Sequence, residues 1–401
     1  MPTKIVYCSF DRFPSPKGAA THIDAFVTAL GQYFGQVDLV TLPSGHKNGN
    51  NQNEELHRSW RAGGVVHHPL NSEGGHLIER ATRFRRNLLR WWSERFKDHR
   101  PAVVHFRSIF EGYPIAQNKN KFCDKIVFEV NGLPSVELKY HYPRIADDNE
   151  LLNKIRHQEN VCLKNADSLI AVSEVTKRYL VSRGVAPQKI TVIPNGVDLD
   201  VFSMPLIRGE KKPESFNAIY SGTMSSWQGV LHAIEAISLF RRDANASLLL
   251  VGPYRKKEAD VIRKKIDRLG LGPHVILREA VSKQTLCNLY HQASAMIAPL
   301  TRCDRNTVQG CCPLKIIEAM ASGIPVISSR IAVVEELVEH DFNGLLVKPN
   351  SSKSIKDALF RLKEEPGLQN RLTTAARRKV ESHFTWPIAI EKLIALYRSI
   401  L

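Results

Sequence analysis

The amino-acid sequence predicts an α/β fold with two doubly wound domains, and three features of the chain indicate it. Short apolar runs such as Lys4 to Phe10 have the composition of strands that are buried on both faces of a parallel sheet. Helical patterns separate these runs over nearly the whole length, which is typical of strand–helix–strand units. With 401 residues, of which 43% are hydrophobic and 24% charged, the chain is long enough for two cores.

The expected elements follow one another in order. Strands of a first domain are predicted at 4–10, 37–42, 64–70, 102–107, 125–131, 168–173 and 190–194, with the first helix over about 21–34. Strands of a second domain are predicted at 217–222, 247–252, 274–277, 295–299 and 325–328. The Gly-, Asn- and Gln-rich segment 44–56 is expected to be a mobile loop, and the polar segment 208–215 a linker between the domains.

The stretch 310–328 is the strongest candidate for a functional site. Its pattern predicts a loop, a short helix that ends at Gly323, and an apolar strand. Unpaired backbone amides at the start of that helix would attract an anion, with Lys315 beside them and Glu318 one turn further along. The local pattern alone fits a structural strand–helix–strand unit without a ligand equally well.

A longer pattern distinguishes these two interpretations. Residues 313–329 spell P-L-K-x-x-E-A-M-A-x-G-x-P-V-I-x-S, and Glu335, Glu336 and the run N-G-L-L-V at 343–347 follow. The pattern resembles the donor-binding signature of the retaining glycosyltransferases of family 4, in a subgroup with P-L-K before its glutamate. The turn P-N-G-V-D at 194–198 resembles the family's turn at the domain junction.

The resemblance implies a GT-B fold, in which two Rossmann-like domains face an interdomain cleft. Residues 1–202 would form the acceptor-side domain and residues 203–385 the donor-binding domain, while a helix at 386–401 would complete the first domain. The implied reaction moves a sugar from a nucleotide diphosphate sugar to an acceptor hydroxyl, with retention of the anomeric configuration and without a metal or other cofactor. The D-x-D at 198–200 falls in the junction turn, so a metal site is not expected there.

The donor site implied by the resemblance includes nine residues: Gly18, Gly222, Thr223, Gln228, Arg302, Gln309, Gly310, Leu314 and Glu318. Glu318 corresponds to the glutamate that holds the nucleotide ribose, and Gly18 lies at the loop that approaches the donor. The family's sugar-binding glutamate would fall at Gly310, so Gln309 or backbone amides are expected to replace it.

The cations of the donor site also depart from the family pattern. Thr223 and Gln228 stand where relatives usually have the arginine and lysine that neutralise the donor diphosphate. Hydroxyl and amide groups can donate hydrogen bonds to phosphate but carry no charge. Lys315, Arg302 and Arg305 are therefore the candidate phosphate cations.

Two predicted strand ends of the first domain carry further candidates. Many relatives have a histidine near one of them, whereas this chain has Arg107 and Asn131 there. Both join Lys315 as candidate catalytic residues. His105 is expected to point into the sheet and pack, and His22, on the first helix, could lie in the core, at the surface or near the cleft.

The formal net charge of +16 and a pI of about 9.6 predict an anionic partner. No zinc-finger spacing or aromatic RNA-binding run is present, so nucleic acid is not expected. The segment 80–100 has eight Lys or Arg residues, and Ala81, Phe84, Leu88, Trp92 and Phe96 recur in it at helical spacing. It fits either an interfacial helix at an anionic membrane or a helix with a core-facing stripe and a solvated arginine face.

The seven cysteines form no C-x-x-C pair, which disfavours a zinc site and a disulfide framework. No apolar run approaches the roughly 18 residues of a membrane span, and the stretch before Ile5 is too short for the apolar part of a signal segment, so none is expected. A cytoplasmic location is expected, with a possible peripheral position on the inner face of the membrane.

The function expected from all of these features is that of a retaining glycosyltransferase. The donor would be a UDP-sugar rather than a GDP-sugar, and the acceptor a hydroxyl of a glycan or lipid-linked glycan in cell-surface polysaccharide or glycolipid synthesis. The alternative is a non-catalytic nucleotide-sugar-binding or membrane-associated partner subunit, because the phosphate Arg/Lys pair and the first glutamate are both missing.

Overall fold

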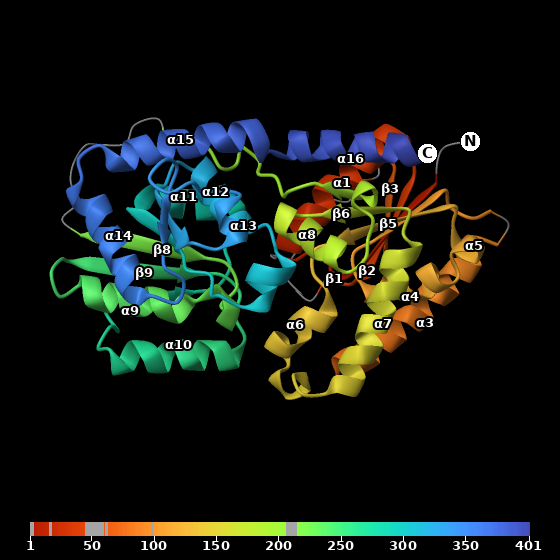
Figure 1. Ribbon diagram of the computed structural model, residues 1–401, viewed down its shortest axis with the longest axis horizontal. Helices are drawn as coiled ribbons and strands as arrows, with labels where there is room; N and C mark the ends of the chain where they lie inside the picture. Colours follow the sequence, from red (N-terminus) through yellow and green to blue (C-terminus); the bar gives the residue numbers. More distant parts are fainter. Residues whose placement is uncertain (1–3, 16–17, 45–59, 61–62, 98, 206–214) are drawn as a thin grey trace. The chain divides into compact units, whose positions relative to one another are not determined.

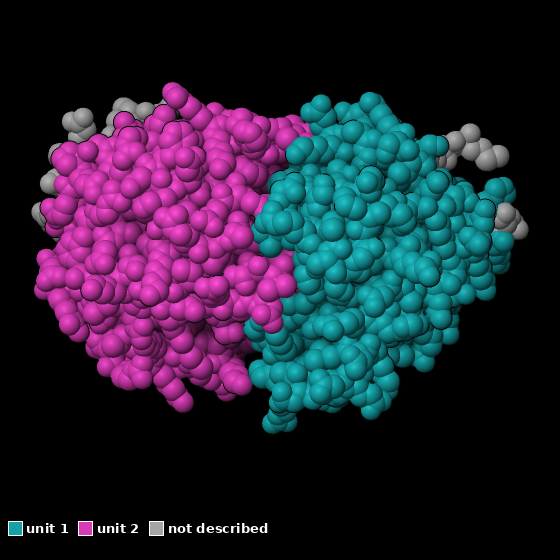
Figure 2. Space-filling view, viewed as in Figure 1, with its two compact units in different colours: residues 1–194, 389–401 teal, residues 195–388 magenta. Residues whose placement is uncertain are grey.

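The computed structural model describes residues 4–15, 18–44, 60, 63–97, 99–205 and 215–401 (Figure 1). The chain divides into two compact units (Figure 2). The first contains residues 1–194 and 389–401, and the second residues 195–388. The sequence had suggested limits at 202 and 386, whereas the units separate at 194 and 388. Most of the predicted loop 44–56 and of the predicted linker 208–215 lies outside the described residues.

The first unit contains a seven-stranded parallel sheet of order β3-β2-β1-β4-β5-β6-β7. The inner strands are mostly buried, as continuous apolar runs require, whereas the edge strand β3 exposes Val66. They are β1 (Ile5–Arg12), β2 (Val37–Leu42), β3 (Val65–Pro69), β4 (Val103–Phe106), β5 (Lys125–Val130), β6 (Ser168–Ala171) and β7 (Ile190–Val192). Each of the seven strands predicted for this half is therefore present.

Helices connect the strands of the first unit, and α3, α4 and α7 pack beside one another (Figure 1). The longer helices are α1 (Gly18–Phe34), α3 (Leu77–Arg95), α4 (Ile109–Gln117), α6 (Pro134–His141), α7 (Asn149–Asn165) and α8 (Glu174–Ser182). Short helical segments are α5 (Lys119–Phe122), η1 (Pro143–Ile145) and η2 (Pro187–Lys189). The last helix, α16 (Trp386–Ile400), begins in the second unit and ends in the first.

The second unit contains a six-stranded parallel sheet of order β10-β9-β8-β11-β12-β13. Its strands are β8 (Phe216–Ser221), β9 (Ala246–Val251), β10 (Val275–Arg278), β11 (Ala295–Ala298), β12 (Val326–Ser329) and β13 (Leu345–Val347). The sequence analysis predicted the first five. It missed β13 because a three-residue apolar run is too short to show a period.

The connections of the second unit are again helical. They are η3 (Ser226–Gln228), α9 (Val230–Phe240), α10 (Lys256–Arg268), α11 (Lys283–Gln292), the π-helix η4 (Arg305–Gln309), α12 (Leu314–Ala321), α13 (Ala332–Glu335), α14 (Ser352–Glu364) and α15 (Leu368–His383). Both units are Rossmann-like, so the predicted fold class is confirmed.

Helix α3 contains most of the basic segment that had two interpretations. Ala81, Phe84, Leu88 and Trp92 are all buried and belong to the core of the first unit or pack against it. The apolar stripe therefore faces the protein interior. The opposite face, with Arg83, exposes its charges, so the stripe itself does not lie at a membrane.

Each sheet has one place where the strand order reverses direction. In the first sheet this switch point lies between β1 and β4, and in the second between β8 and β11. Ligands of open α/β sheets bind beyond the carboxyl ends of the strands at such points, so a ligand site is expected at both positions.

Candidate functional site

The second unit places Lys315 at the switch point of its sheet. The residue occupies the second position of α12, and its side chain is buried, with 8% of its surface exposed. Its Nζ donates to the hydroxyl of Tyr220 at 2.9 Å and to Oε1 of Gln228 at 2.5 Å. It also lies 4.3 Å from the centre of the Tyr220 ring. The ammonium is thus held by neutral groups at the carboxyl end of β8.

The surroundings of Lys315 disfavour its charge. Burial, with a smaller contribution from the charge of Arg305, lowers the pKa of Lys315 to about 7. Among the described residues, no carboxylate forms an ion pair with this ammonium. A buried cation without a counter-charge is costly, so the site favours an anion supplied from outside.

Gly222 makes room for the ammonium where β8 ends. Its φ is +118°, a region that residues with a side chain rarely adopt. A Cβ at this position would lie 3.1 Å from Nζ of Lys315. The absence of a side chain at Gly222 therefore leaves the space beside the ammonium open.

Glu318 lies one turn further along α12 and is partly exposed. Burial raises the pKa of this carboxyl to about 7, although the charges of Lys283 and Lys315 oppose the shift. Among the described residues, no hydrogen bond to its side chain is present. The predicted ribose-binding carboxylate is thus partly covered and could accept hydrogen bonds from hydroxyl groups of a ligand.

The segment before α12 brings other predicted donor residues near this site. The Arg305 guanidinium lies 5.6 Å from the centre of the Trp227 ring, whereas Arg302 is exposed. Gln309 is buried at the end of the π-helix, and Gly310 follows it with a φ of +88°. Of these residues, Arg305 is the one whose charge acts on Lys315.

The remaining predicted donor residues of the second unit are Thr223 and Leu314. The backbone oxygen of Thr223 accepts a 2.5 Å hydrogen bond from the hydroxyl of Tyr220. Leu314 is the first residue of α12 and is partly exposed. Thr223 therefore contacts a residue that holds the Lys315 ammonium, and Leu314 precedes Lys315 in the chain.

The junction turn supports the same loop. The Asn195 amide donates to the backbone oxygen of Cys312 at 2.7 Å, directly before α12. The Asp198 carboxylate accepts from the backbone nitrogen of Asp200 at 2.9 Å, as a turn-forming aspartate does. The structure therefore gives the P-N-G-V-D turn a positioning role for the loop that precedes Lys315.

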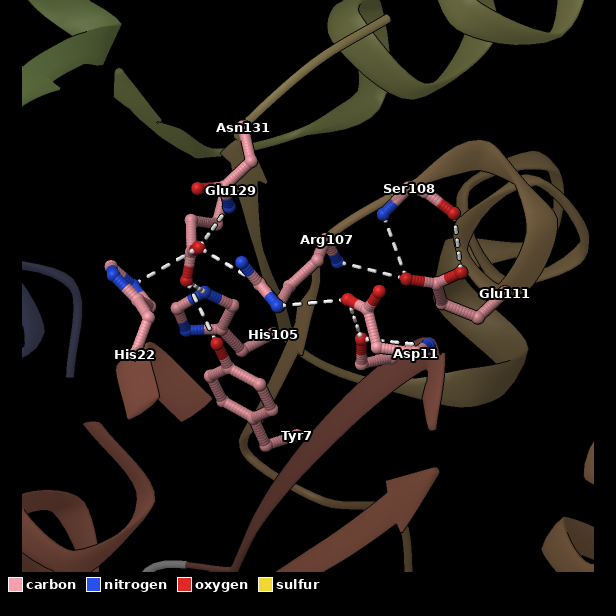
Figure 3. A network of polar contacts seen from close by, with 10 residues as sticks. Tyr7, Asp11, His22, His105, Arg107, Ser108, Glu111, Glu129 and Asn131 are labelled. Carbon is pink, nitrogen blue, oxygen red and sulfur yellow. Dashed lines mark hydrogen bonds and ion pairs between the residues drawn. The ribbon is translucent and has the colours of Figure 1, made fainter. Parts of the chain in front are cut away.

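The first unit holds a separate polar network around Glu129 of β5 (Figure 3). This carboxylate is fully buried and accepts from Tyr7 at 2.8 Å and from Nε of Arg107 at 2.9 Å. Nε2 of His22 and of His105 lie 3.1 and 3.2 Å from its oxygens. Although burial alone would raise the pKa of Glu129, the neighbouring His22 and Arg107 hold it well below its usual value.

Arg107 differs from the expectation of an available cation at a strand end. It is buried, and its guanidinium pairs with Glu129 and, at 2.9 Å, with Asp11 (Figure 3). Two carboxylates thus neutralise its charge, because a buried guanidinium needs counter-charges. Its predicted catalytic role would have to be exerted through this network.

The other polar residues of the first unit also gather at Glu129. Asn131 donates to its carboxylate from the turn after β5. His105 is buried, with Nδ1 2.9 Å from the hydroxyl of Tyr397 on α16, which confirms its expected packed role. His22 is buried on α1 and contacts Glu129. Asn131 is the one predicted catalytic residue of this unit that is partly exposed.

Comparisons with known proteins agree with the fold. Residues 16–201 match the family model "Glycosyltransferase Family 4" and residues 207–379 the model "Glycosyl transferases group 1". Together the two models span both units.

The chain is of the GT-B, family 4 glycosyltransferase type.

Relatives of this glycosyltransferase include the amylovoran biosynthesis glycosyltransferase AmsK of Erwinia amylovora. The two are 25% identical over 257 residues, which cover 64% of this chain and 58% of AmsK. The matches to the curated relatives span less than two thirds of those proteins' own length.

Solved structures resemble this glycosyltransferase over 99% of its length. Sucrose-phosphate synthase from Thermosynechococcus elongatus has a TM-score of 0.80 at 19% identity, and 99% of its chain is covered. The HepE protein of Anabaena, in complex with UDP and glucose, has a TM-score of 0.75 at 15% identity over its full chain.

Two residues of the candidate sites, Glu129 and Tyr220, were not predicted from the sequence. Glu129 interrupts an apolar strand, and a carboxylate in such a strand needs buried partners, a signal that could have revealed the network. Tyr220 fits a buried strand by composition, so no sequence signal distinguished it. Gly18 is the first residue of α1, but the loop residues 16 and 17 lie outside the described part of the chain.

No helix among the described residues has the length and apolar character needed to cross a membrane.

Proposed function

We propose that the protein is a retaining glycosyltransferase that takes a sugar from a nucleotide diphosphate sugar, with UDP preferred over GDP. The observation that carries this proposal is the Lys315 ammonium, which is buried at the switch point without an ion-pair partner among the described residues. A diphosphate would supply the missing counter-charge. The UDP bound to HepE supports the choice of nucleotide.

The roles of the residues follow from their positions. Lys315 and the backbone amides at the start of α12 would stabilise the charge that develops on the leaving diphosphate. Glu318 would accept hydrogen bonds from the ribose hydroxyls. The departing phosphate would help to deprotonate the acceptor on the same face, and no metal would be needed.

The acceptor is proposed to be a hydroxyl of a glycan or a lipid-linked glycan. The polysaccharide role in the name of AmsK supports this choice. Asn131 of the first unit, which is partly exposed, would take part in catalysis, and Arg107 would act on it through Glu129.

The proposal is tested by measuring release of UDP from a panel of UDP-sugars with and without glycan acceptors, in the presence of EDTA. Acceptor-dependent release that Lys315→Met abolishes supports it, and product NMR would then show a retained anomeric configuration. Saturable UDP binding without turnover on any acceptor would instead support a non-catalytic partner subunit. Dependence on a divalent metal would contradict the metal-free mechanism.

A peripheral position on an anionic membrane is also proposed, through the outer face of α3. That face exposes Arg83, Arg86 and Arg90 together with the apolar side chains of Ile78 and Leu89. Sedimentation with vesicles that contain anionic lipid should carry the wild-type protein down. The triple variant Arg83→Glu, Arg86→Glu, Arg90→Glu should remain in the supernatant, and equal sedimentation of both proteins would refute this position.

A further inference from the structure

The position of the Lys315 ammonium is fixed by two side chains that carry no charge. Tyr220 of β8 and Gln228 of η3 accept its hydrogen bonds at 2.9 and 2.5 Å. A lysine side chain has four rotatable bonds and loses much conformational entropy when it is held in one place. Residues that hold it before a ligand arrives reduce the entropy lost on binding.

The hydroxyl of Tyr220 is oriented to accept rather than to donate. Its own hydrogen is directed at the backbone oxygen of Thr223, 2.5 Å away. Because a phenol has a single O–H, the lone pairs that remain face Lys315. The ring of Tyr220 adds a cation–π contact at 4.3 Å. Both the hydroxyl and the ring of Tyr220 therefore favour the charged form of the Lys315 amine.

Gln228 is held in the same way by its own segment. Its backbone nitrogen donates to the oxygen of Ser225 at 2.9 Å, which closes the turn of η3. The preceding residue, Trp227, is tied by its backbone oxygen to the nitrogen of Thr301 at 3.0 Å and to the amide of Asn306 at 3.0 Å. The loop after β11 thus fixes the loop that carries Gln228.

The ammonium retains capacity for a ligand. It has three N–H groups, and among the described residues Tyr220 and Gln228 engage two of them. The charged or titratable groups that act on it are Glu318 on the same helix, Arg305 on the π-helix and Cys311 before α12. None of these forms a hydrogen bond with its Nζ within the described part of the chain.

We propose that Tyr220 and Gln228 are positioning residues that hold the Lys315 ammonium, through its first two N–H groups, so that its third points at the diphosphate of the donor. The inference rests on the proposed donor site, and it says which residues hold the cation of that site in place before the ligand binds. It assigns to Gln228 an action through Lys315 rather than on the phosphate itself.

The test measures UDP affinity by titration calorimetry between pH 6 and 9. Tyr220→Phe keeps the ring but removes the acceptor that favours the charged amine. It should weaken UDP binding about fivefold at pH 7, and affinity should be lost at a lower pH than in the wild type. Gln228→Leu changes a partly exposed residue, so folding should tolerate it, and it should act in the same direction.

Tyr290→Phe is the matched control. The Tyr290 hydroxyl is equally buried in the same unit, but it pairs with Ser221 at 2.6 Å and has no bond to Lys315. This variant should leave both the affinity and its pH profile unchanged. Equal effects of Tyr220→Phe and Tyr290→Phe, or an unshifted pH profile in Tyr220→Phe and Gln228→Leu, would overturn the inference. Failure of the wild type to bind UDP at any pH would overturn the donor site itself, which is a different result.

Discussion

Nζ of Lys315 lies 2.5 Å from Oε1 of Gln228, so the cation and the loop after β8 meet although 87 residues separate them in the chain. The sequence had indicated that Gln228 takes the place of a phosphate-binding lysine. In the structure the ammonium of Lys315 reaches the same loop from α12. The loop after β8 has no cation of its own, and Lys315 of α12 supplies a positive charge there.

The pH dependence of UDP binding should be bell-shaped, with a maximum near pH 7. The pKa of Lys315 is about 7, so its charge is lost and phosphate binding weakens as the pH rises above that value. The pKa of Glu318 is also about 7, so the carboxylate that is proposed to accept from ribose is lost as the pH falls. Calorimetric titrations from pH 5.5 to 9 measure the curve. In Glu318→Gln the fall of affinity at acid pH should reflect only the protonation of UDP itself, because the variant has no carboxyl group at this position. An acid limb identical to that of the wild type would contradict the role of Glu318 in binding UDP.

Glu318→Gln should stabilise the empty protein at pH 8 while weakening UDP binding about tenfold. The pKa of Glu318 in the folded protein lies above its ordinary value, so the ionised carboxylate, which predominates above pH 7, lowers the free energy of unfolding. The neutral carboxyl group does not have this effect. The gain in melting temperature should be present at pH 8 and shrink as the pH falls toward 4.5. Melting curves at both pH values measure it, and an equal change at both would refute a raised pKa.

Glu129→Gln should destabilise the first unit by about 3–5 kcal/mol, because Arg107 would remain buried with one of its two counter-charges removed. The pKa of Glu129 lies well below its ordinary value, so its stabilisation is present above about pH 4.5 and is lost as the pH falls. Urea unfolding at pH 7 and pH 4 should therefore show a large difference from wild type at pH 7 and a smaller one at pH 4.

A surface carboxylate of the same unit provides the control for that measurement. Glu150 pairs with Lys154, and both side chains are largely exposed. Glu150→Gln should change the free energy of unfolding by less than about 0.5 kcal/mol. Equal effects of Glu129→Gln and Glu150→Gln would show that the buried network does not stabilise the unit.

Gly222→Ala should lower UDP affinity about tenfold, because the added methyl group would lie 3.1 Å from Nζ of Lys315 and the backbone φ is unfavourable. Gly270 also has a positive φ, but a Cβ there would meet nothing within 4 Å. Gly270→Ala should therefore reduce stability by about 1 kcal/mol without a change in affinity. Wild-type affinity in Gly222→Ala would contradict a ligand site beside this glycine.

The sequence predicted the strands well because continuous apolar runs between turn residues identify buried parallel strands whatever the rest of the chain does. It also predicted α12 with Lys315 and Glu318, since the helix start and stop signals are local. The strand β13 was missed because its three residues carry too little pattern.

The partners of the site residues were not predictable in the same way. Arg107 was expected to present a charge, but Glu129 and Asp11, from two other strands, neutralise it. Tyr220 reaches Lys315 across 95 positions of the chain. Such contacts depend on strand register and side-chain direction, which a single sequence does not specify.

The most direct test of the central claim compares UDP binding by the wild-type protein and by Lys315→Met. Loss of one charge-assisted hydrogen bond to the diphosphate should cost about 2 kcal/mol, or roughly thirtyfold in affinity, at pH 7. The difference should shrink at pH 9, where the lysine is neutral in the empty site. Equal affinities of the two proteins at pH 7, or no UDP binding by the wild type, would contradict the claim that Lys315 binds the donor diphosphate.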